Sequence, residues 1–396
     1  MSSTSIIGDY LLISLPRAST DDKPTLVQWL ERSINGGGNQ VFDQELPKFK
    51  VGTLDSLILQ SEELAKYDQQ LESSIIKTLD IINSTSSSNA NGSGFTTVKA
   101  PKVDGKLVDQ FFENFQWNTS RFRLDKSVEE LIKLITNEAL TIDSDLKTSY
   151  NAYNAAKSNL LAAQRKQTGD LSIKSLHDIV KADDFILDSE HLTTVLLAVP
   201  KSIDSQFLNS YETLTQFVIP RSAKKIATDA EFNLYTVSLF KKFQATFLNS
   251  AREQKWIPRD FEYSEETINL LKNEYQNAIK EETNLKNDLI RLSKEAYSEL
   301  VSSWVHVKIL ETFVESVLRY GLPPDFNCFA IKLLEPSDKV VKAAKDQLIE
   351  KFGYLGGNAF ATDKNGKVVK DNSLHEYAAL VNTEYEPFVL YEVVLH

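Results

Sequence analysis

The chain has 396 residues, 42% hydrophobic and 25% charged, which is typical of a folded protein with two or three hydrophobic cores and excludes a disordered one. Its formal net charge of -11 argues against a nucleic-acid-binding protein, because phosphate contacts require a basic surface. The single cysteine, Cys328, excludes an internal disulfide and a multi-cysteine zinc site, and it indicates a reducing, cytosolic compartment.

No apolar run approaches the roughly 18 residues that a membrane span needs. The first residues contain neither the basic segment nor the small-residue cleavage site of a signal peptide. We therefore expect any association with a membrane to occur through a partner.

The N-terminal third predicts a strand at 10–16, a helix from about 54 to 82, and a strand at 115–124, where apolar and polar residues alternate. Between the last two, residues 83–94 read NSTSSSNANGSG and offer almost nothing to bury. We expect this segment to form a mobile loop.

A long helix is predicted to begin at Ser127, because Glu130 stands three residues later at the spacing of a capping box. Apolar residues then recur in steps of three and four from Val128 to Ala163, and Gly169 is expected to end the helix in a left-handed conformation. At 1.5 Å per residue, such a helix is a rod of roughly 60 Å.

Residues 168–263 predict a mixed α/β domain. Strands are expected at 192–200 and 232–240, and helices around 202–218 and 241–254. No internal sequence repeat is evident.

A second long helix is predicted from Ser264, its N-cap, to Gly321, which precedes a proline pair. Its apolar residues form a narrow stripe over 268–296 and appear on all sides beyond Leu300. The first half therefore needs one partner face, whereas the second half is expected to be buried. After it, the sequence predicts a strand at 326–334, a helix around 337–351 and a final strand at 387–395.

The two long helices have apolar stripes of similar length and are expected to pair as an antiparallel neck. The predicted fold is thus α+β, an elongated dumbbell in which two mixed α/β domains are joined by that neck. Its expected parts are a foot at 1–124, a neck helix at 125–167, an inserted head at 168–263, a second neck helix at 264–296, and the rest of the foot at 297–396.

The segment 177–191 contains five acidic residues together with His177 and His191, which raises the possibility of a metal or acid/base site. The two histidines are fourteen residues apart and lack the spacing of a helical ligand pair. A turn leading into a buried strand is the simpler interpretation, so neither a catalytic residue, a cofactor nor a metal ion is predicted. His306 and Cys328 fall in apolar stretches and are expected to be satisfied core residues.

The charges of the predicted head are segregated along the sequence, with acidic residues over 170–190 and basic residues over 221–259. Such a field can orient a protein partner and raise its encounter rate. The alternative is that these charges are solvated faces which share no surface. The candidate partner-binding residues are Arg221, Lys224, Lys225, Lys241 and Lys242.

Several segments closely resemble the C subunit family of the eukaryotic vacuolar-type proton ATPase, in its fungal form. In chain order these are FQWNTSRFRLDKSVEELI (115–132), GDLSIKSLHDIVKADDFILDSEHLTTVLLAVPK (169–201), VESVLRYGLPPDFN (314–327), FGYLGGNAF (352–360) and SLHEYAALVNTEYEPFVLY (373–391). The resemblance covers nearly the whole chain. It weakens at 17–40 and 83–105, regions taken as loops, and at the last few residues.

This resemblance implies a non-catalytic connector in the V1 sector that joins peripheral-stalk E/G heterodimers to the cytosolic domain of the membrane-sector a subunit. It also implies a dumbbell of head, neck and foot, reversible release during V1-Vo disassembly, and a place on the cytosolic face of the vacuolar membrane. Some members of the family are associated with actin or nucleotide binding.

Two other functions are compatible with the sequence. The first is a metal-dependent enzyme with its site at 177–191. The second is a coiled-coil tether of the cytoskeleton, for example of actin, which would need its helices to pair between molecules. The connector is instead expected to be a monomer when isolated.

Overall fold

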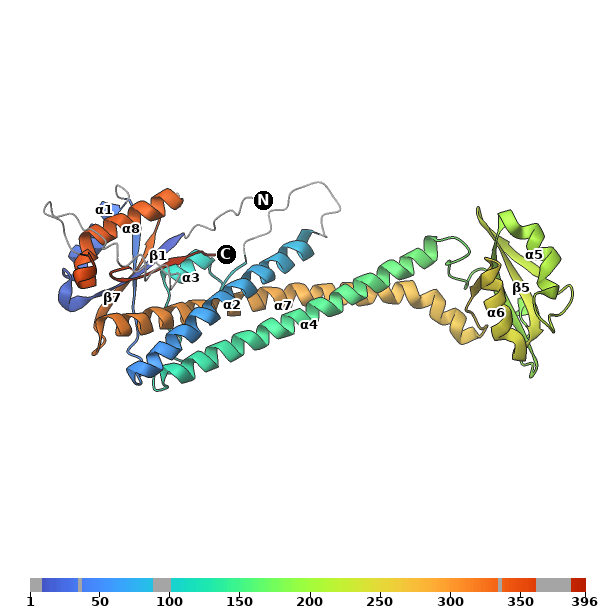
Figure 1. The fold of residues 1–396 in the computed structure, drawn as a ribbon, viewed down its shortest axis with the longest axis horizontal. Coiled ribbons are helices and arrows are strands. Elements are labelled where there is room, and N and C mark those ends of the chain that lie inside the picture. Colours follow the sequence, from blue (N-terminus) through green and yellow to red (C-terminus); the bar gives the residue numbers. More distant parts are fainter. Residues whose placement is uncertain (1–8, 35–37, 88–100, 334–336, 361–385) are drawn as a thin grey trace. The chain divides into compact units, whose positions relative to one another are not determined.

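The computed structural model describes residues 9–34, 38–87, 101–333, 337–360 and 386–396. The chain divides into two compact units, one formed by Met1–Thr148 with Ile290–His396 and the other by Ser149–Leu289 (Figure 1). Each unit is built on a four-stranded antiparallel sheet, and helices pack against both. The α+β class is therefore confirmed.

The sheet of the first unit is assembled from both ends of the chain. Its strand order is β2 (Gln40–Gln44), β7 (Phe326–Lys332), β1 (Tyr10–Pro16) and β8 (Val389–Val393). The helices of this unit outside the two longest are α1 (Lys23–Ser33), α2 (Leu54–Ser87), α3 (Val108–Glu113) and α8 (Asp338–Phe352). The predicted strands at 10–16, 326–334 and 387–395 and the helix around 337–351 are confirmed with slightly different ends.

Strand β1 is buried on both faces, which explains its continuous apolar sequence. Leu11 and Ile13 point to a core shared with α1 and α8, whereas Tyr10 and Leu12 point to a core shared with α2 and the two long helices. The sheet is thus the middle of three layers, with α1 and α8 on one side (Figure 1).

Three expectations for this unit were wrong. Residues 115–124 form turns instead of a strand, because Phe115, Trp117 and Phe122 turn inward around the ring of His306. Helix α1 lies within the stretch taken as a loop. Helix α2 continues to Ser87, into the expected loop 83–94, and residues 88–94 lie outside the described residues.

The two longest helices are α4 (Val128–Thr168) and α7 (Glu265–Tyr320), as the caps predicted. The Ser127 backbone N–H donates to Glu130 at 2.9 Å and the Glu130 N–H donates to Ser127 Oγ at 3.3 Å, so the capping box is present. Ser264 Oγ likewise accepts from the Thr267 N–H at 3.0 Å. Gly321 ends α7 with a φ of 86°.

Gly169 does not end α4 in the expected way, since it is not among the described glycines with positive φ. Glycine is needed there because a larger side chain would clash with its neighbours. A Cβ there would lie 2.5 Å from Ile173 Cγ1 and 2.7 Å from the Arg165 carbonyl oxygen. Close approach of the following turn, and not backbone handedness, is the reason for glycine at this position.

Helices α4 and α7 pack antiparallel, as predicted. Within the second unit, Tyr153 hydrogen-bonds Glu282, and Lys166 Nζ lies 2.5 Å from Glu274. The residue numbers of the α7 partners thus decrease as those of α4 increase, which is the pattern of an antiparallel pair. Glu282, a polar residue within the apolar stripe, thus has a partner on the facing helix. In the first unit, α7 beyond Leu300 is buried on nearly all sides.

The sheet of the second unit has the order β4 (Lys224–Thr228), β5 (Phe232–Phe240), β3 (Leu192–Pro200) and β6 (Ile257–Arg259). Helices α5 (Asp204–Ser210) and α6 (Gln244–Glu253) cover one face through Phe207 and Phe247, both fully buried. The predicted strands are confirmed. The expected helix at 202–218 is shorter, because the chain turns and Val218 bridges to Leu239 of β5.

This unit contains an internal repeat, so the expectation of none was wrong. Residues 192–210 and 232–250 each form a strand, a short 3-10 turn and a helix, and both helices contain FLNS. Leu196 pairs with Thr236, its own equivalent forty positions later, which places a pseudo-twofold axis between β3 and β5. An IPR triplet follows each copy, at 219–221 and 257–259.

Candidate partner-binding surface

The five basic candidates lie toward one end of the sheet in the second unit. Lys224 and Lys225 begin β4, Arg221 stands in the turn before it, and Lys241 and Lys242 form the 3-10 turn that follows β5. Because β4 and β5 are antiparallel, the start of one lies near the end of the other. The basic residues therefore come from neighbouring segments of two paired strands, although Lys224 and Lys225 pair with Thr236 and Tyr235, five and six positions before Lys241.

Unlike the other four basic candidates, Lys224 is already held in an ion pair within the unit. Its Nζ lies 2.6 Å from Asp184, whose side chain is almost buried, and this hydrogen bond lowers the pKa of Asp184. The acidic and basic segments that were separate in the sequence meet at this pair. Among the described residues, the exposed side chains of Arg221, Lys225, Lys241 and Lys242 have no ion-pair partner.

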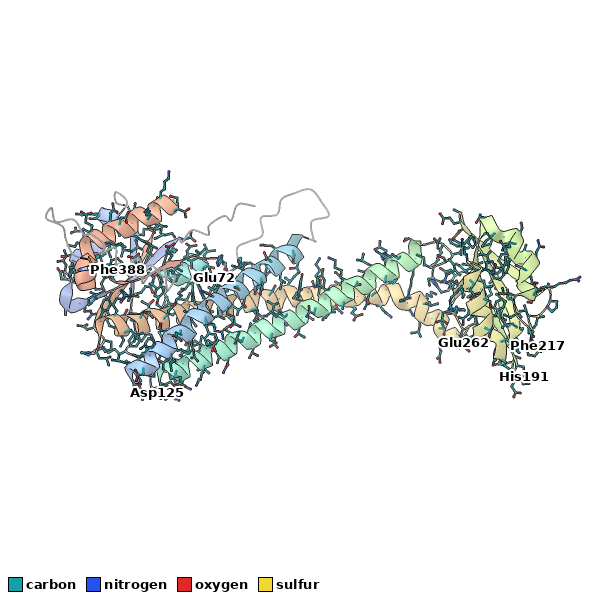
Figure 2. All side chains as sticks on the ribbon, viewed as in Figure 1. Glu72, Asp125, His191, Phe217, Glu262 and Phe388 are labelled. Carbon is teal, nitrogen blue, oxygen red and sulfur yellow. The ribbon has the colours of Figure 1, made fainter. Side chains whose placement is uncertain are left out.

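Three phenylalanines stand beside these cations and were missed from the sequence. The ring of Phe217 stacks on Phe243 with centroids 4.8 Å apart and meets the edge of Phe240 at 5.7 Å. Phe217 is 56% exposed and Phe240 is 39% exposed. Figure 2 labels Phe217 and His191 at this end of the unit, where the Lys241 N–H donates to the His191 carbonyl at 2.8 Å. The run FKKF at 240–243, in which two lysines stand between the last residue of a strand and a second phenylalanine, is the signal that could have indicated the cluster.

The acid and histidine segment 177–191 does not converge on one point. His177 contacts its own neighbours, Ser175 Oγ at 2.9 Å through Nδ1 and Asp178 at 3.0 Å through Nε2, and Asp184 is held by Lys224. Within the described part of the chain, no three histidine, cysteine, aspartate or glutamate side chains are grouped so as to hold a metal ion. The geometry therefore gives no support to a metal-dependent enzyme at this segment.

The core positions predicted for His306 and Cys328 are confirmed. Burial lowers the pKa of His306 to about 4, its Nδ1 donates to the Ser302 carbonyl at 2.7 Å, and its Nε2 accepts from the Asn118 N–H. Burial also raises the pKa of the Cys328 thiol far above its usual value, so this thiol is unreactive.

Comparison with known proteins assigns the whole chain. The family model for the V-ATPase C subunit matches residues 10–389. The V-type proton ATPase C subunit of Saccharomyces cerevisiae is 49% identical over 392 residues, covering 98% of each chain. The chain belongs to the family of V-ATPase C subunits.

Other relatives in this C subunit family are animal proteins. The V-type proton ATPase C subunit 1-A of Danio rerio is 34% identical over 97% of each chain, and the C subunit 1 of Rattus norvegicus is 36% identical over 88% of each. The solved cytoplasmic N-terminal domain of the I subunit of V-ATPase shows a TM-score of only 0.34 at 11% identity, with 87% of this chain and 97% of that chain covered. That TM-score is too low to indicate a common fold.

Family membership confirms the resemblance seen in the sequence. As a member of the C subunit family, the chain is a non-catalytic component of the peripheral stalk of a proton-transporting ATPase. None of the helices in the described residues is both long enough and apolar enough to cross a membrane.

Proposed function

We propose that this chain connects E/G stalk heterodimers to the cytosolic domain of the membrane-sector a subunit and that its release controls V1-Vo assembly. In this proposal residues 168–263 form a head, residues 1–124 with 297–396 form a foot, and 125–167 with 264–296 form the neck of a dumbbell. The observation that carries the proposal is 49% identity to the yeast protein across 98% of both chains.

The two compact units support this function. Each has its own sheet and its own cores, and α4 and α7 both continue from one unit into the other. A rotary motor needs a stator that resists torque, and a stator that must also detach needs several separable contacts that hold jointly through effective concentration. A chain with two docking units joined by paired helices meets both requirements.

The helix pairing also weighs against a cytoskeletal tether. In the first unit, apolar residues of α4 and α7 belong to one core. In the second unit, Tyr153, Ala156 and Ala163 of α4 are buried, and polar contacts join the two helices. The two helices thus pair within one molecule. We expect the isolated chain to be a monomer, cytoplasmic when free, and associated with the cytosolic face of the vacuolar membrane only through the assembled complex.

Isothermal titration of the purified full chain with a purified E/G heterodimer tests this function directly. We expect tight, saturable binding, and we expect added chain to restore proton pumping to recombined V1 and Vo sectors. A folded chain that shows no binding at micromolar concentration would contradict the connector role.

A further inference from the structure

The cluster of Phe217, Phe240 and Phe243 is costly to the free protein. Phe217 has a φ of 62°, in the left-handed region that a bulky side chain seldom adopts. Its ring is also more than half exposed to solvent. An apolar ring exposed to water opposes stability, so a benefit elsewhere is expected.

The internal repeat shows what the fold itself requires here. The pseudo-twofold axis relates Phe217 to Lys255, because each stands two residues before the IPR triplet of its own copy. Lys255 has a φ of 63°, so both copies use the same backbone turn. Phe240 and Phe243 correspond to Pro200 and Ile203. The same architecture therefore forms with Lys, Pro and Ile at these three places, and the aromatic trio is not needed for folding.

The arginines of the two IPR triplets also differ, because one side chain is hydrogen-bonded to the fold and the other is exposed. Arg259 is partly buried and its guanidinium donates to the carbonyls of Leu171 and Lys174, at 2.5 and 2.6 Å. The guanidinium of its equivalent, Arg221, has no hydrogen-bond or ion-pair partner among the residues that the structure describes. One copy uses its arginine to hold the fold. The other leaves its arginine side chain exposed, four positions after Phe217, in a turn where the Arg221 N–H donates to Glu212 at 2.8 Å.

The neighbouring edge strand does not favour the addition of a partner strand. Strand β4 begins with two lysines and its register shifts between Lys225 and Ala227, two features that discourage strand addition. The three rings instead form a compact apolar centre that matches the stripe of a helix over about two turns, roughly 10 Å.

We propose that Phe217, Phe240 and Phe243, rimmed by Arg221, Lys241 and Lys242, form the docking surface for an amphipathic helix whose apolar stripe is flanked by acidic side chains. The inference rests on the proposed function, in which the E/G heterodimer supplies this helix. Aromatic side chains provide the binding energy and the cations orient the acidic flanks.

The decisive variant is Phe217→Lys, because it installs the residue that the same turn already carries at position 255. We expect its thermal stability to equal or exceed that of the wild type, and its Kd for a purified E/G heterodimer to rise at least about tenfold. Phe243→Ile, which copies Ile203, is a second variant with the same expectation and remains informative if the first fails to fold.

Leu208→Lys is the matched control. Leu208 lies on α5, is 46% exposed and belongs to the same unit, so its replacement removes similar apolar surface away from the trio. We expect its Kd to stay within about twofold of wild type. Lys241→Glu combined with Lys242→Glu should slow association and flatten the salt dependence of binding.

The binding measurements test the inference and the proposed function separately. If the wild type binds the heterodimer and Phe217→Lys and Phe243→Ile bind equally well, the inference is wrong and the proposed function stands. If the wild type does not bind, both are wrong. A variant that binds the heterodimer normally but no longer sediments with phosphatidylserine vesicles would assign the trio to a lipid surface. A variant that binds it normally but no longer self-associates in ultracentrifugation would assign the trio to a second copy of the chain. Either result would overturn the inference.

Discussion

At the scale of single residues, the first unit contains an ion cluster almost excluded from water. Lys308 Nζ lies 2.8 Å from Asp68 and 3.3 Å from Glu311, and the indole N–H of Trp304 also donates to Asp68. The cluster joins α2 to α7 in the core. Its cation is shared by two carboxylates, so its removal leaves buried negative charge without compensation.

We therefore expect Lys308→Met to destabilise the protein by about 3 kcal/mol, because breaking a buried pair costs far more than breaking an exposed one. Urea unfolding followed by tryptophan fluorescence measures the change. Lys133→Met is the control, since Lys133 pairs with Glu129 on the solvent side of α4 and its loss should leave the midpoint unchanged. Equal effects of the two substitutions would refute the role given to the buried cluster.

Glu311 gives this cluster a pH dependence. Burial, with Asp68 and Glu315 nearby, raises the pKa of Glu311 from 4.5 to about 7 against the opposing effect of Lys308. The folded protein then keeps a proton that the unfolded chain releases between these values, so this group's contribution to stability falls as pH rises from 4.5 through 7.

Comparison of the wild type with Glu311→Gln isolates this contribution. His306 acts in the opposite sense, because its lowered pKa of about 4 makes stability fall as pH drops from 6.5, but its effect cancels in the difference between the two proteins. We expect the stability difference to change by at most about 1.4 kcal/mol per pH unit. A difference in unfolding free energy that is constant from pH 4.5 to 7 would show that Glu311 titrates normally.

At the scale of elements, the end of α4 depends on the absence of one side chain. Gly169→Ala should destabilise the second unit by about 1–3 kcal/mol, because its Cβ meets a backbone carbonyl that cannot move away. Gly52→Ala is the control, since its Cβ would meet only the side chain of Ser56, whose hydroxyl can shift at the cost of one exposed hydrogen bond to the Thr53 carbonyl. Thermal unfolding compares them, and an equal shift for both would mean that the turn after α4 relaxes freely.

Elements with their own local signals could be predicted from the sequence, and the others could not. Helices α4 and α7 carry caps and long apolar stripes, so their starts were found within a residue. Strand β6 has three residues, one of them Pro258, and is formed only because β3 offers it an edge. The alternation at 115–124 arose from packing around His306, a contact nearly two hundred positions away in sequence.

The candidate binding surface could likewise be predicted only in part from the sequence. The basic residues were visible as a charge pattern, although only the fold reveals that Lys224 is held by Asp184. The repeat was hidden because FLNS and IPR are short and their spacing changes from forty to thirty-eight positions between them. Strand register and two matching left-handed turns, at Phe217 and Lys255, were needed to recognise it.

At the scale of the whole molecule, the two units have separate cores although α4 and α7 belong to both. Phe207 is fully buried between α5 and β5 in the second unit, whereas Phe329 is fully buried between the sheet and α8 in the first. Units with independent cores unfold as separate cooperative transitions when the segments that join them contribute little coupling.

Differential scanning calorimetry should therefore resolve two transitions in the full chain. Replacement of either phenylalanine by alanine costs about 3–5 kcal/mol in the core that loses it. We expect Phe207→Ala to lower the midpoint of one transition and Phe329→Ala to lower only the other. If both substitutions shift a single common transition, the long helices couple the units into one cooperative body, and the stator would then transmit load from end to end without an independently yielding part.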